Sequence, residues 1–178
     1  MLGLHARPRG ETDSLTEELN SPASRLLIRR LSAQASTLLE DRDEVLPFTH
    51  LNRQRFGVIT VGAQNAAPFV DRLRGYAPIS YVSRLHAASS EEEIKGIIDV
   101  ITHSTTTIVA LFSRKEEDRQ LAQKILKKAK GKILVFFSSP YTLPEYDAPI
   151  AEAYATLLPD KHTPATQESA AQAIRSAI

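Results

Sequence analysis

The loop Gly62-Ala63-Gln64-Asn65 is the first place where this sequence could do chemistry, because it follows a strongly apolar stretch, as a phosphate-binding loop does. Such loops use several glycines, in the patterns G-x-G-x-x-G or G-x-x-x-x-G-K-[ST], to bring backbone amides close to a phosphate. This loop has one glycine, so a plain strand-to-helix turn is a better interpretation than a nucleotide site. The segment Ser113-Arg114-Lys115 could hold an anion at a helix N-terminus, but a solvated turn explains it more simply.

Histidine and serine are present without the spacing that zinc sites and serine hydrolases need. The five histidines are His5, His50, His86, His103 and His162. No two of them are four residues apart or beside a suitable run of carboxylates, so no zinc site is predicted. His103 is expected to close a helix, where a positive charge suits the helix dipole. No serine lies in a G-x-S-x-G sequence, so no nucleophile elbow is predicted.

Three carboxylates late in the chain, Glu145, Asp147 and Glu152, could reach a neighbouring active site from a loop or a sheet edge. A solvated loop is the simpler interpretation. The runs Glu91–Glu93 and Glu116–Asp118 are typical of first helical turns, where negative charge suits the helix dipole. The sequence therefore assigns no catalytic, cofactor-binding or metal-binding residue.

The elements that would position these candidates alternate regularly from Arg55 onwards. Apolar, β-branched runs predict strands, and apolar residues repeated every three or four positions predict helices. The expected strands are 56–61, 78–82, 106–112 and 133–137. The expected helices are 66–73, a helix that begins at Ser89 or Ser90 with a capping box, and 116–130, which Gly131 stops.

Strands that are apolar on both faces and alternate with helices indicate a parallel sheet covered on both sides. The predicted fold class is α/β: a three-layer α/β/α sandwich, flavodoxin-like, with a mostly parallel sheet of five to six strands. In open sheets of this kind ligands bind beyond the carboxyl ends of the strands. The loops after Val61, Phe112 and Phe137 are therefore the places where a site is expected.

The tail of the chain continues the same pattern. The strand 133–137 stops at Ser138-Ser139-Pro140-Tyr141, and a second strand is expected over 150–157. Because this second stretch mixes apolar and polar positions, it is predicted to be an outer strand. A closing helix over 163–178 is capped by Thr163-Pro164 and turns Ala170, Ala171 and Ile174 toward the sheet.

The first fifty residues differ from the rest, so the chain is divided into an N-terminal linker and packing helix (1–50) and the sandwich domain (51–178). Residues 1–20 are polar and can hold a short helical turn around 14–19. Ser21-Pro22 then begins a helix with an apolar stripe of Leu26, Leu27, Leu31 and Ala35, and such a stripe needs a partner surface. Val45–Phe48 is expected to be extended, because a helix cannot continue into Pro47.

Composition excludes several classes of protein. The 22 basic and 21 acidic side chains leave a net charge of +1, which favours neither nucleic acid nor an anionic membrane. Without cysteine there is no disulfide framework and no thiolate metal site. No apolar run reaches the roughly 18–20 residues of a membrane helix, and the N-terminus is not a signal peptide, so the chain is expected to be soluble.

The tail resembles the C-terminal domain of family 3 glycoside hydrolases. That family has a similar strand, a Pro-Tyr turn, a second strand ending near a tyrosine, and a Gln-x-Ala-Ala-Gln-Ala helix. The segments that carry the likeness are Ile133–Leu143, Ala151–Tyr154 and Thr163–Ile174.

The N-terminal part resembles the same family. Leu2-Gly3-Leu4 is similar to the exit from the catalytic barrel's last element. Ser32–Glu40 followed by Val45–Phe48 is similar to a family segment in which a helix leads to an extended Leu-Pro stretch. The nearest likeness is to the β-N-acetylglucosaminidase branch, which includes large bacterial proteins with a β-lactamase-like module after this domain.

The resemblance implies a non-catalytic accessory domain that caps or braces a catalytic (β/α)8 barrel upstream of Leu2, within a parent enzyme that hydrolyses O-glycosyl bonds. The family's catalytic aspartate belongs to the barrel, so neither a cofactor nor a catalytic residue is expected in this chain, which would be inactive alone. The expected partners are the barrel, the sugar substrate of the parent and, in large relatives, the β-lactamase-like module. A periplasmic or exported parent is compatible with this branch, and the sequence leaves the location open.

Two other functions stay open at this point. The chain could be a freestanding flavodoxin-like domain that binds a ligand or a signalling partner at the Gly62 or Ser138 loops. It could also be an enzyme acting on its own, which activity of the isolated chain on a chromogenic N-acetylglucosaminide would reveal.

Overall fold

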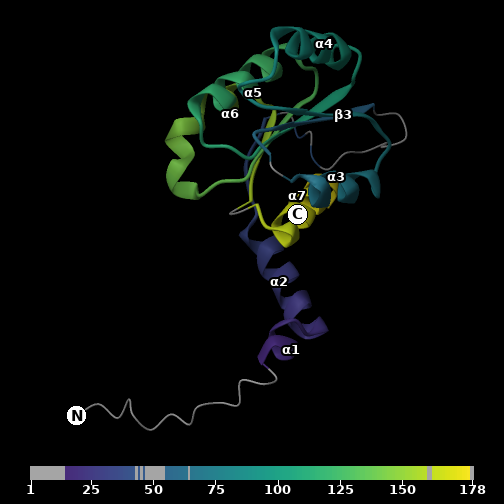
Figure 1. The fold of residues 1–178 in the computed structure, drawn as a ribbon, viewed down its shortest axis with the longest axis vertical. Helices are drawn as coiled ribbons and strands as arrows, with labels where there is room; N and C mark the ends of the chain where they lie inside the picture. The colour runs from purple at the N-terminus through teal and green to yellow at the C-terminus, as the bar shows by residue number, and fades with distance from the viewer. Residues whose placement is uncertain are drawn as a thin grey trace, which may run out of the picture.

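A six-stranded sheet forms the middle layer of the computed structural model, which describes residues 15–42, 44, 46, 55–63, 65–159 and 162–176 (Figure 1). Its strands lie in the order β1-β6-β5-β4-β2-β3. All neighbouring pairs are parallel except β1 and β6, which are antiparallel. The strands are β1 (Thr37–Asp41), β2 (Phe56–Val61), β3 (Ile79–Leu85), β4 (Thr106–Leu111), β5 (Lys132–Phe136) and β6 (Ala155–Leu158).

Helices cover both faces of this sheet, so the predicted three-layer α/β/α sandwich is confirmed. Figure 1 shows α3 and α7 on one side and α4, α5 and α6 on the other. The helices are α1 (Leu15–Leu19), α2 (Pro22–Ala35), α3 (Ala67–Arg74), α4 (Glu91–Ile101), α5 (Glu116–Lys128), α6 (Asp147–Glu152) and α7 (Pro164–Ser176), with a 3-10 helix, η2 (Pro140–Tyr146), before α6.

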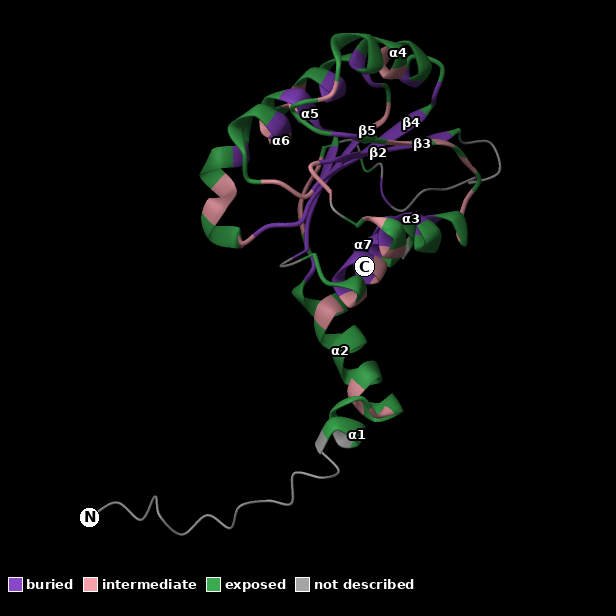
Figure 2. Ribbon diagram, viewed as in Figure 1, coloured by how far each residue is buried: buried purple, intermediate pink, exposed green. Residues whose placement is uncertain are grey.

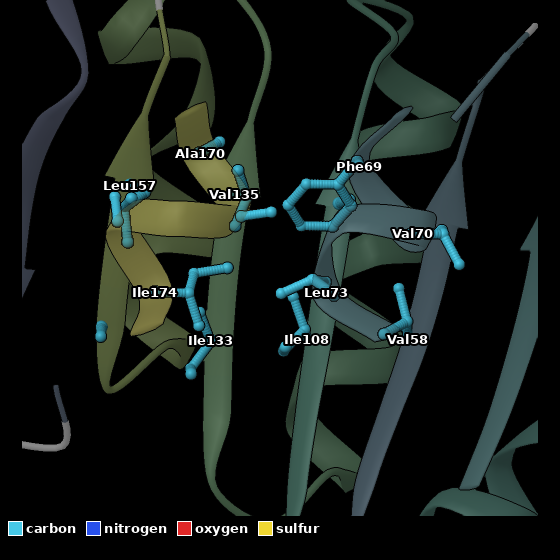
Figure 3. Packing of buried hydrophobic residues seen from close by; sticks show 14 of the residues in the cluster. Val58, Phe69, Val70, Leu73, Ile108, Ile133, Val135, Leu157, Ala170 and Ile174 are labelled. Carbon is cyan, nitrogen blue, oxygen red and sulfur yellow. The ribbon is translucent and has the colours of Figure 1, made fainter. Parts of the chain in front are cut away.

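Each face of the sheet has its own apolar core, because the side chains of a strand point alternately to opposite faces. In β2, Val58 packs toward α3 and α7, whereas Ile59 packs toward α4 and α5. Every residue of β2 and of β4 is buried, as expected of central parallel strands. Figure 3 shows the first core, with Val58, Phe69, Val70, Leu73, Ile108, Ile133, Val135, Leu157, Ala170 and Ile174 labelled.

Local signals in the sequence fix several element ends. Ser90 accepts a hydrogen bond from the Glu93 amide, and the Glu93 carboxylate accepts one from the Ser90 amide, so α4 begins with the predicted capping box. Thr163 caps α7 through the Thr166 amide, as expected. Gly131 has a φ of +49° directly before β5, a conformation that suits glycine.

The structure corrects the prediction for 150–157. Residues 147–152 form α6, and the strand there is the shorter β6, which lies between β5 and β1 with all four residues buried. The outer strand on that side is β1, most of which the family resemblance of Ser32–Glu40 placed in a helix. β1 pairs antiparallel with β6, including Leu38 opposite Leu157. The expected extended segment Val45–Phe48 lies outside the described residues except for Leu46, which is buried in the first core.

α2 begins at the predicted Ser21-Pro22 signal and projects from the sandwich (Figures 1 and 2). Ser21 caps it by accepting a hydrogen bond from the Ser24 amide at 3.2 Å. None of its fourteen residues is buried. The expected short helical turn before it is present as α1. Within the part of the chain that the structure describes, no helix is long and apolar enough to cross a membrane.

Candidate functional site

The carboxyl ends of β2 and β4 lie at the point where the direction of strand succession reverses. After β2, the chain adds β3 on one side of it and then returns to add β4 on the other. The two connections therefore leave in opposite directions, and a crevice opens between the strand ends. This is the place where open α/β sheets bind ligands.

A hollow of about 320 Å³ lies at this crevice. Volumes of this order are typical of small-molecule sites. It is bounded by the loop after β2, the end of β4, the start of α3 and the segment that leads into α7. The residues lining it are Gly62, Asn65, Pro68, Phe112, His162, Pro164 and Gln167. The hollow thus joins segments that lie about a hundred residues apart in the sequence.

Gln167 holds the walls of the hollow together. Its side chain is buried, with 3% of its surface exposed. Its Oε1 accepts a hydrogen bond from the Phe69 amide at 3.3 Å, and its Nε2 donates to the Asn65 carbonyl at 3.2 Å and the His162 carbonyl at 3.0 Å. One amide group therefore connects α3, the loop after β2 and the loop before α7.

Side chains accept hydrogen bonds from three of the amides in the first turns of the two helices beside the hollow. Asn65 Oδ1 accepts a hydrogen bond from the Ala67 amide at 3.0 Å, and Gln167 Oε1 accepts one from Phe69. At the start of α7, Thr163 Oγ1 accepts from the Thr166 amide at 3.3 Å. Free amides at a helix N-terminus attract anions, so these three caps weaken the usual attraction for a phosphate.

An aromatic cluster adjoins the hollow through Phe112. The Phe112 ring stacks on Phe137 with centroids 4.4 Å apart and planes at 16°, and Phe137 meets Phe69 edge-on at 5.6 Å. Phe69 and Phe137 are buried, whereas Phe112 is partly exposed and lines the hollow. Phe112 thus gives the hollow an apolar surface packed on other rings, while Asn65 and His162 are polar residues of its lining.

Gly62 makes the sharp turn out of β2. Its φ is +68°, and its amide donates to the Leu85 carbonyl at 2.9 Å. A Cβ here would overlap Ser113 and lie 3.0 Å from Asp118 Oδ2, so a glycine is needed for this close approach. Gln64, the third residue of the loop Gly62–Asn65, lies outside the described residues.

Ser113-Arg114-Lys115 forms a turn that is closed by its own contacts. Ser113 Oγ accepts a hydrogen bond from the Lys115 amide at 3.1 Å, and the Arg114 carbonyl accepts one from Arg119. The Tyr146 hydroxyl donates to the Ser113 carbonyl at 3.3 Å. These contacts favour the structural interpretation of the segment as a turn that leads into α5.

Ser138 and Tyr141 of the segment after β5 have different surroundings. Ser138 is buried, and its hydroxyl lies 2.9 Å from Thr142 Oγ1 and 3.5 Å from the Tyr146 hydroxyl. Tyr141 is 94% exposed. The polar groups of this turn therefore serve the start of η2, and they lie outside the residues that line the hollow.

The three histidines that the structure describes lie in separate places. His103 lies just beyond α4, where its Nδ1 is 3.0 Å from the Asp99 carbonyl oxygen, whereas His86 is exposed in the loop after β3 and His162 lines the hollow. His5 and His50 lie outside the described residues. Among the residues that the structure describes, no cluster of three or more His, Cys, Asp or Glu side chains could hold a metal ion.

The three late carboxylates lie on the outer surface of the α5–α6 side. Glu145 forms an ion pair with Arg119 at 2.9 Å, and Glu152 lies 3.8 Å from Lys127. Asp147 is exposed in the first turn of α6. The structure thus spreads these residues over a helical surface, where two of them pair with side chains of α5.

Gln167 and Phe112 were not predicted to be site residues. A signal for Gln167 was present, because Gln167, Ala170, Ala171 and Ile174 have the i, i+3, i+4, i+7 spacing of one helix face. A glutamine on a face that packs against a sheet must find partners for its amide. Phe112 gave no such signal, since it continues the apolar run of β4.

No protein-family model and no curated protein matches this sequence. Solved structures match it in fold. A β-glucosidase from Listeria innocua in complex with glucose aligns with a TM-score of 0.72 and 15% identity, over 91% of this chain and 26% of the other. A fungal multi-domain GH3 β-N-acetylglucosaminidase aligns with a TM-score of 0.74 and 15% identity, over 91% of this chain and 19% of the other.

A GH3 β-N-acetylglucosaminidase from Paenibacillus sp. also aligns, with a TM-score of 0.69 and 12% identity, over 88% of this chain and 31% of the other. The chain therefore spans about a fifth to a third of the length of these enzymes. At such low identity the likeness establishes the fold alone: this chain has the fold of one part of these larger glycosidases.

Proposed function

We propose that this chain is the C-terminal domain of a family 3 glycoside hydrolase of the β-N-acetylglucosaminidase branch, and that it braces or caps the catalytic barrel without supplying catalytic groups. The observation that carries the proposal is the asymmetry of the fold match. The likeness to the fungal GH3 enzyme covers 91% of this chain but 19% of the enzyme. A chain that matches such enzymes over nearly its whole length, but over a small part of theirs, is expected to serve as one of their domains.

An exposed apolar face on α2 supports the bracing role. Leu27 and Leu31 are one turn apart, and they are 57% and 55% exposed. Arg29 lies between them in sequence and on nearly the opposite side of the helix, because residues two apart differ by about 200° around the axis. Arg29 forms an ion pair with Glu168 of α7 at 3.3 Å. The side of α2 that carries Arg29 thus contacts the sandwich, and the leucine face turns away from it.

This arrangement is unfavourable for a helix that only covers its own domain. Amphipathic helices turn their apolar stripe toward the core. A face with two half-exposed leucines pointing outward is instead typical of a surface that packs on another part of the protein. In the proposed enzyme, that part is the barrel.

The late carboxylates suit a domain without catalytic groups. Glycosidases use a pair of carboxyl groups on either side of the scissile bond. Here Glu145 and Glu152 are paired with Arg119 and Lys127 on the α5–α6 surface. The β-lactamase-like module implied by the sequence resemblance stays a prediction.

The gene that encodes the chain provides the first test. An open reading frame that continues upstream into a predicted (β/α)8 barrel would support the proposal, and a stop codon directly upstream would overturn it. The full-length product and residues 1–178 would then be assayed with 4-nitrophenyl N-acetyl-β-D-glucosaminide, β-D-glucoside and β-D-xyloside. We expect hydrolysis by the full-length protein alone, fastest with the N-acetylglucosaminide.

Each assay outcome bears on a separate part of the proposal. Hydrolysis by residues 1–178 alone would contradict the non-catalytic role. If the full-length protein prefers the glucoside or the xyloside, the assignment to family 3 stands, but the assignment to the β-N-acetylglucosaminidase branch is overturned. A variant of the full-length protein with Glu145→Gln and Glu152→Gln should keep its activity, and a loss of activity with the fold intact would show that this domain supplies a catalytic carboxylate.

A second candidate function is a freestanding flavodoxin-like binding domain, which the hollow beside Gly62 favours. It predicts that no barrel is encoded upstream. The same reading frame therefore decides between the two functions.

A further inference from the structure

We propose that the hollow at the ends of β2 and β4 is a binding site for a neutral, polyhydroxylated ring of about the size of a monosaccharide. The proposal rests on the geometry of this site and not on the role of the domain in an enzyme. Its size gives the first argument. A volume of about 320 Å³ lies at the low end of small-molecule sites, so it suits a single ring better than a dinucleotide.

The capped helix starts argue against an anion. A phosphate at this kind of crevice is held by free amides at a helix N-terminus and by basic side chains. Here the Ala67, Phe69 and Thr166 amides donate to side chains of Asn65, Gln167 and Thr163. Among the described residues, no lysine or arginine lines the hollow.

The remaining groups match the two kinds of surface that a sugar ring presents. A pyranose has an apolar face of C–H groups and a rim of hydroxyls. Phe112, held by stacking at 4.4 Å on Phe137, provides an aromatic surface, and Pro68 and Pro164 add apolar contact. His162 and Asn65 also line the hollow, and an imidazole and a side-chain amide can exchange hydrogen bonds with hydroxyls.

The site is organised before any ligand arrives. Gln167 fixes the positions of Asn65 and His162 by donating to both of their carbonyls. The cap from Asn65 Oδ1 to the Ala67 amide also fixes the orientation of the Asn65 side chain, which directs its Nδ2 away from the helix start. Among the described residues, no hydrogen bond occupies Asn65 Nδ2 or the His162 ring. Preorganised groups of this kind bind without the cost of ordering them.

The test uses residues 1–178 in solution, with binding followed by two-dimensional NMR of backbone amides. The probes are N-acetyl-D-glucosamine, D-glucose and D-xylose as neutral sugars, and glucose 6-phosphate and AMP as anions. We expect saturable shifts with at least one neutral sugar, centred on Gly62, Phe112 and Gln167. No saturation by any neutral sugar up to about 100 mM, or tighter binding of either anion, would overturn the proposal.

Two variants and one control locate the binding. His162→Ala alters an exposed side chain and should weaken binding about threefold to tenfold, as the loss of one hydrogen bond does. Asn65→Asp keeps an oxygen to cap α3 but removes the Nδ2 donor, and should weaken binding by a similar factor. His103→Ala, beyond α4, should leave it unchanged. Equal binding by wild type, His162→Ala and Asn65→Asp would place the sugar elsewhere and overturn the site.

This test separates the inference from the proposed function. Sugar binding in a chain whose gene encodes no barrel would uphold the site and overturn the accessory role. A gene that encodes a barrel upstream, together with no saturable sugar binding, would support the accessory role and overturn the site.

Discussion

At the scale of single residues, Gln167 has the largest structural role in the candidate site. Its amide makes three hydrogen bonds to backbone groups that come from three segments of the chain. Replacement by leucine would keep the volume but leave the buried Phe69 amide without its acceptor. We expect Gln167→Leu to lower the free energy of unfolding by about 1–3 kcal/mol.

Urea denaturation of Gln167→Leu beside Gln120→Leu would check this prediction. Gln120 is exposed on α5, where its Nε2 donates to Glu116 at 3.0 Å, so its replacement should cost less than about 0.5 kcal/mol. Equal effects of the two changes would mean that the Gln167 bonds add nothing to stability beyond the loss of a surface contact.

Tyr81 gives a prediction for alkaline pH. Its ring lies across Gly57 of β2, where a side chain would overlap it. Burial raises the pKa of the phenol above its usual value of 10.0. Ser104 and Thr107 oppose the shift, but neither reaches hydrogen-bond geometry with the hydroxyl, which is buried without a partner among the described residues. The folded state therefore favours the protonated phenol.

The stability that this protonated phenol contributes is present below pH 10 and is lost as the pH rises through the higher pKa of the folded state. Tyr81→Phe should therefore show a smaller loss of stability between pH 9 and pH 11 than wild type. At pH 7 it should change the free energy of unfolding by less than about 1 kcal/mol, because the hydroxyl has no partner to lose. Denaturation curves at pH 7, 9, 10 and 11 measure both effects. Parallel pH dependences of the two proteins would contradict the raised pKa.

The sequence predicted individual residues well where their role is local. Ser90 and Thr163 cap helices because serine and threonine can bond to amides a few residues ahead, and the sequence shows both. The role of Gln167 could not be predicted in the same way. Its partners at Asn65 and Phe69 lie 102 and 98 residues away, so they depend on how α3 packs beside α7.

At the scale of elements, β2 could be predicted from local sequence, whereas β1 depends on a distant partner. Strand β2 is buried along its whole length, and its apolar, β-branched residues make a strand identifiable from local sequence. β1 follows α2 after one residue, so its two leucines continued a helical pattern. Pairing with β6, more than a hundred residues later, makes it a strand. The error over 150–157 has a related cause, since a short helix and a short strand share that apolar stretch.

A pair of truncations tests the contribution of β1. Residues 36–178 keep the strand, whereas residues 43–178 lose it and expose the edge of β6. We expect the longer piece to unfold at nearly the same urea concentration as the full chain. The shorter piece should be less stable and should self-associate, because an open strand edge pairs with other chains. Equal stability and a monomeric state for both pieces, by denaturation and analytical ultracentrifugation, would contradict a structural role for β1.

At the scale of the whole molecule, the hollow and the leucine face of α2 are two separate surfaces with different proposed roles. The hollow lies at the carboxyl edge of the sheet, between α3 and α7, whereas the leucine face of α2 projects from the sandwich on a helix held through Arg29 and Glu168. A domain with both could be anchored by one surface and bind a small molecule at the other. The two surfaces can therefore be altered separately.

The α2 face yields a prediction that depends on what surrounds the domain. In residues 1–178 alone, Leu27→Glu should change the free energy of unfolding by less than about 0.5 kcal/mol, because the side chain is 57% exposed. In a full-length protein with the proposed barrel, the same change would bury a charge and lower the unfolding temperature of the assembled enzyme.

Leu26→Glu is the matched control. Leu26 is 51% exposed but lies on the side of the helix that carries the arginines, so its replacement should have little effect in either protein. Differential scanning calorimetry of both variants in both proteins measures the difference. Equal shifts from Leu26→Glu and Leu27→Glu in the full-length protein would contradict packing through this face, and a large loss of stability from Leu27→Glu in residues 1–178 alone would mean that Leu27 already packs within the domain.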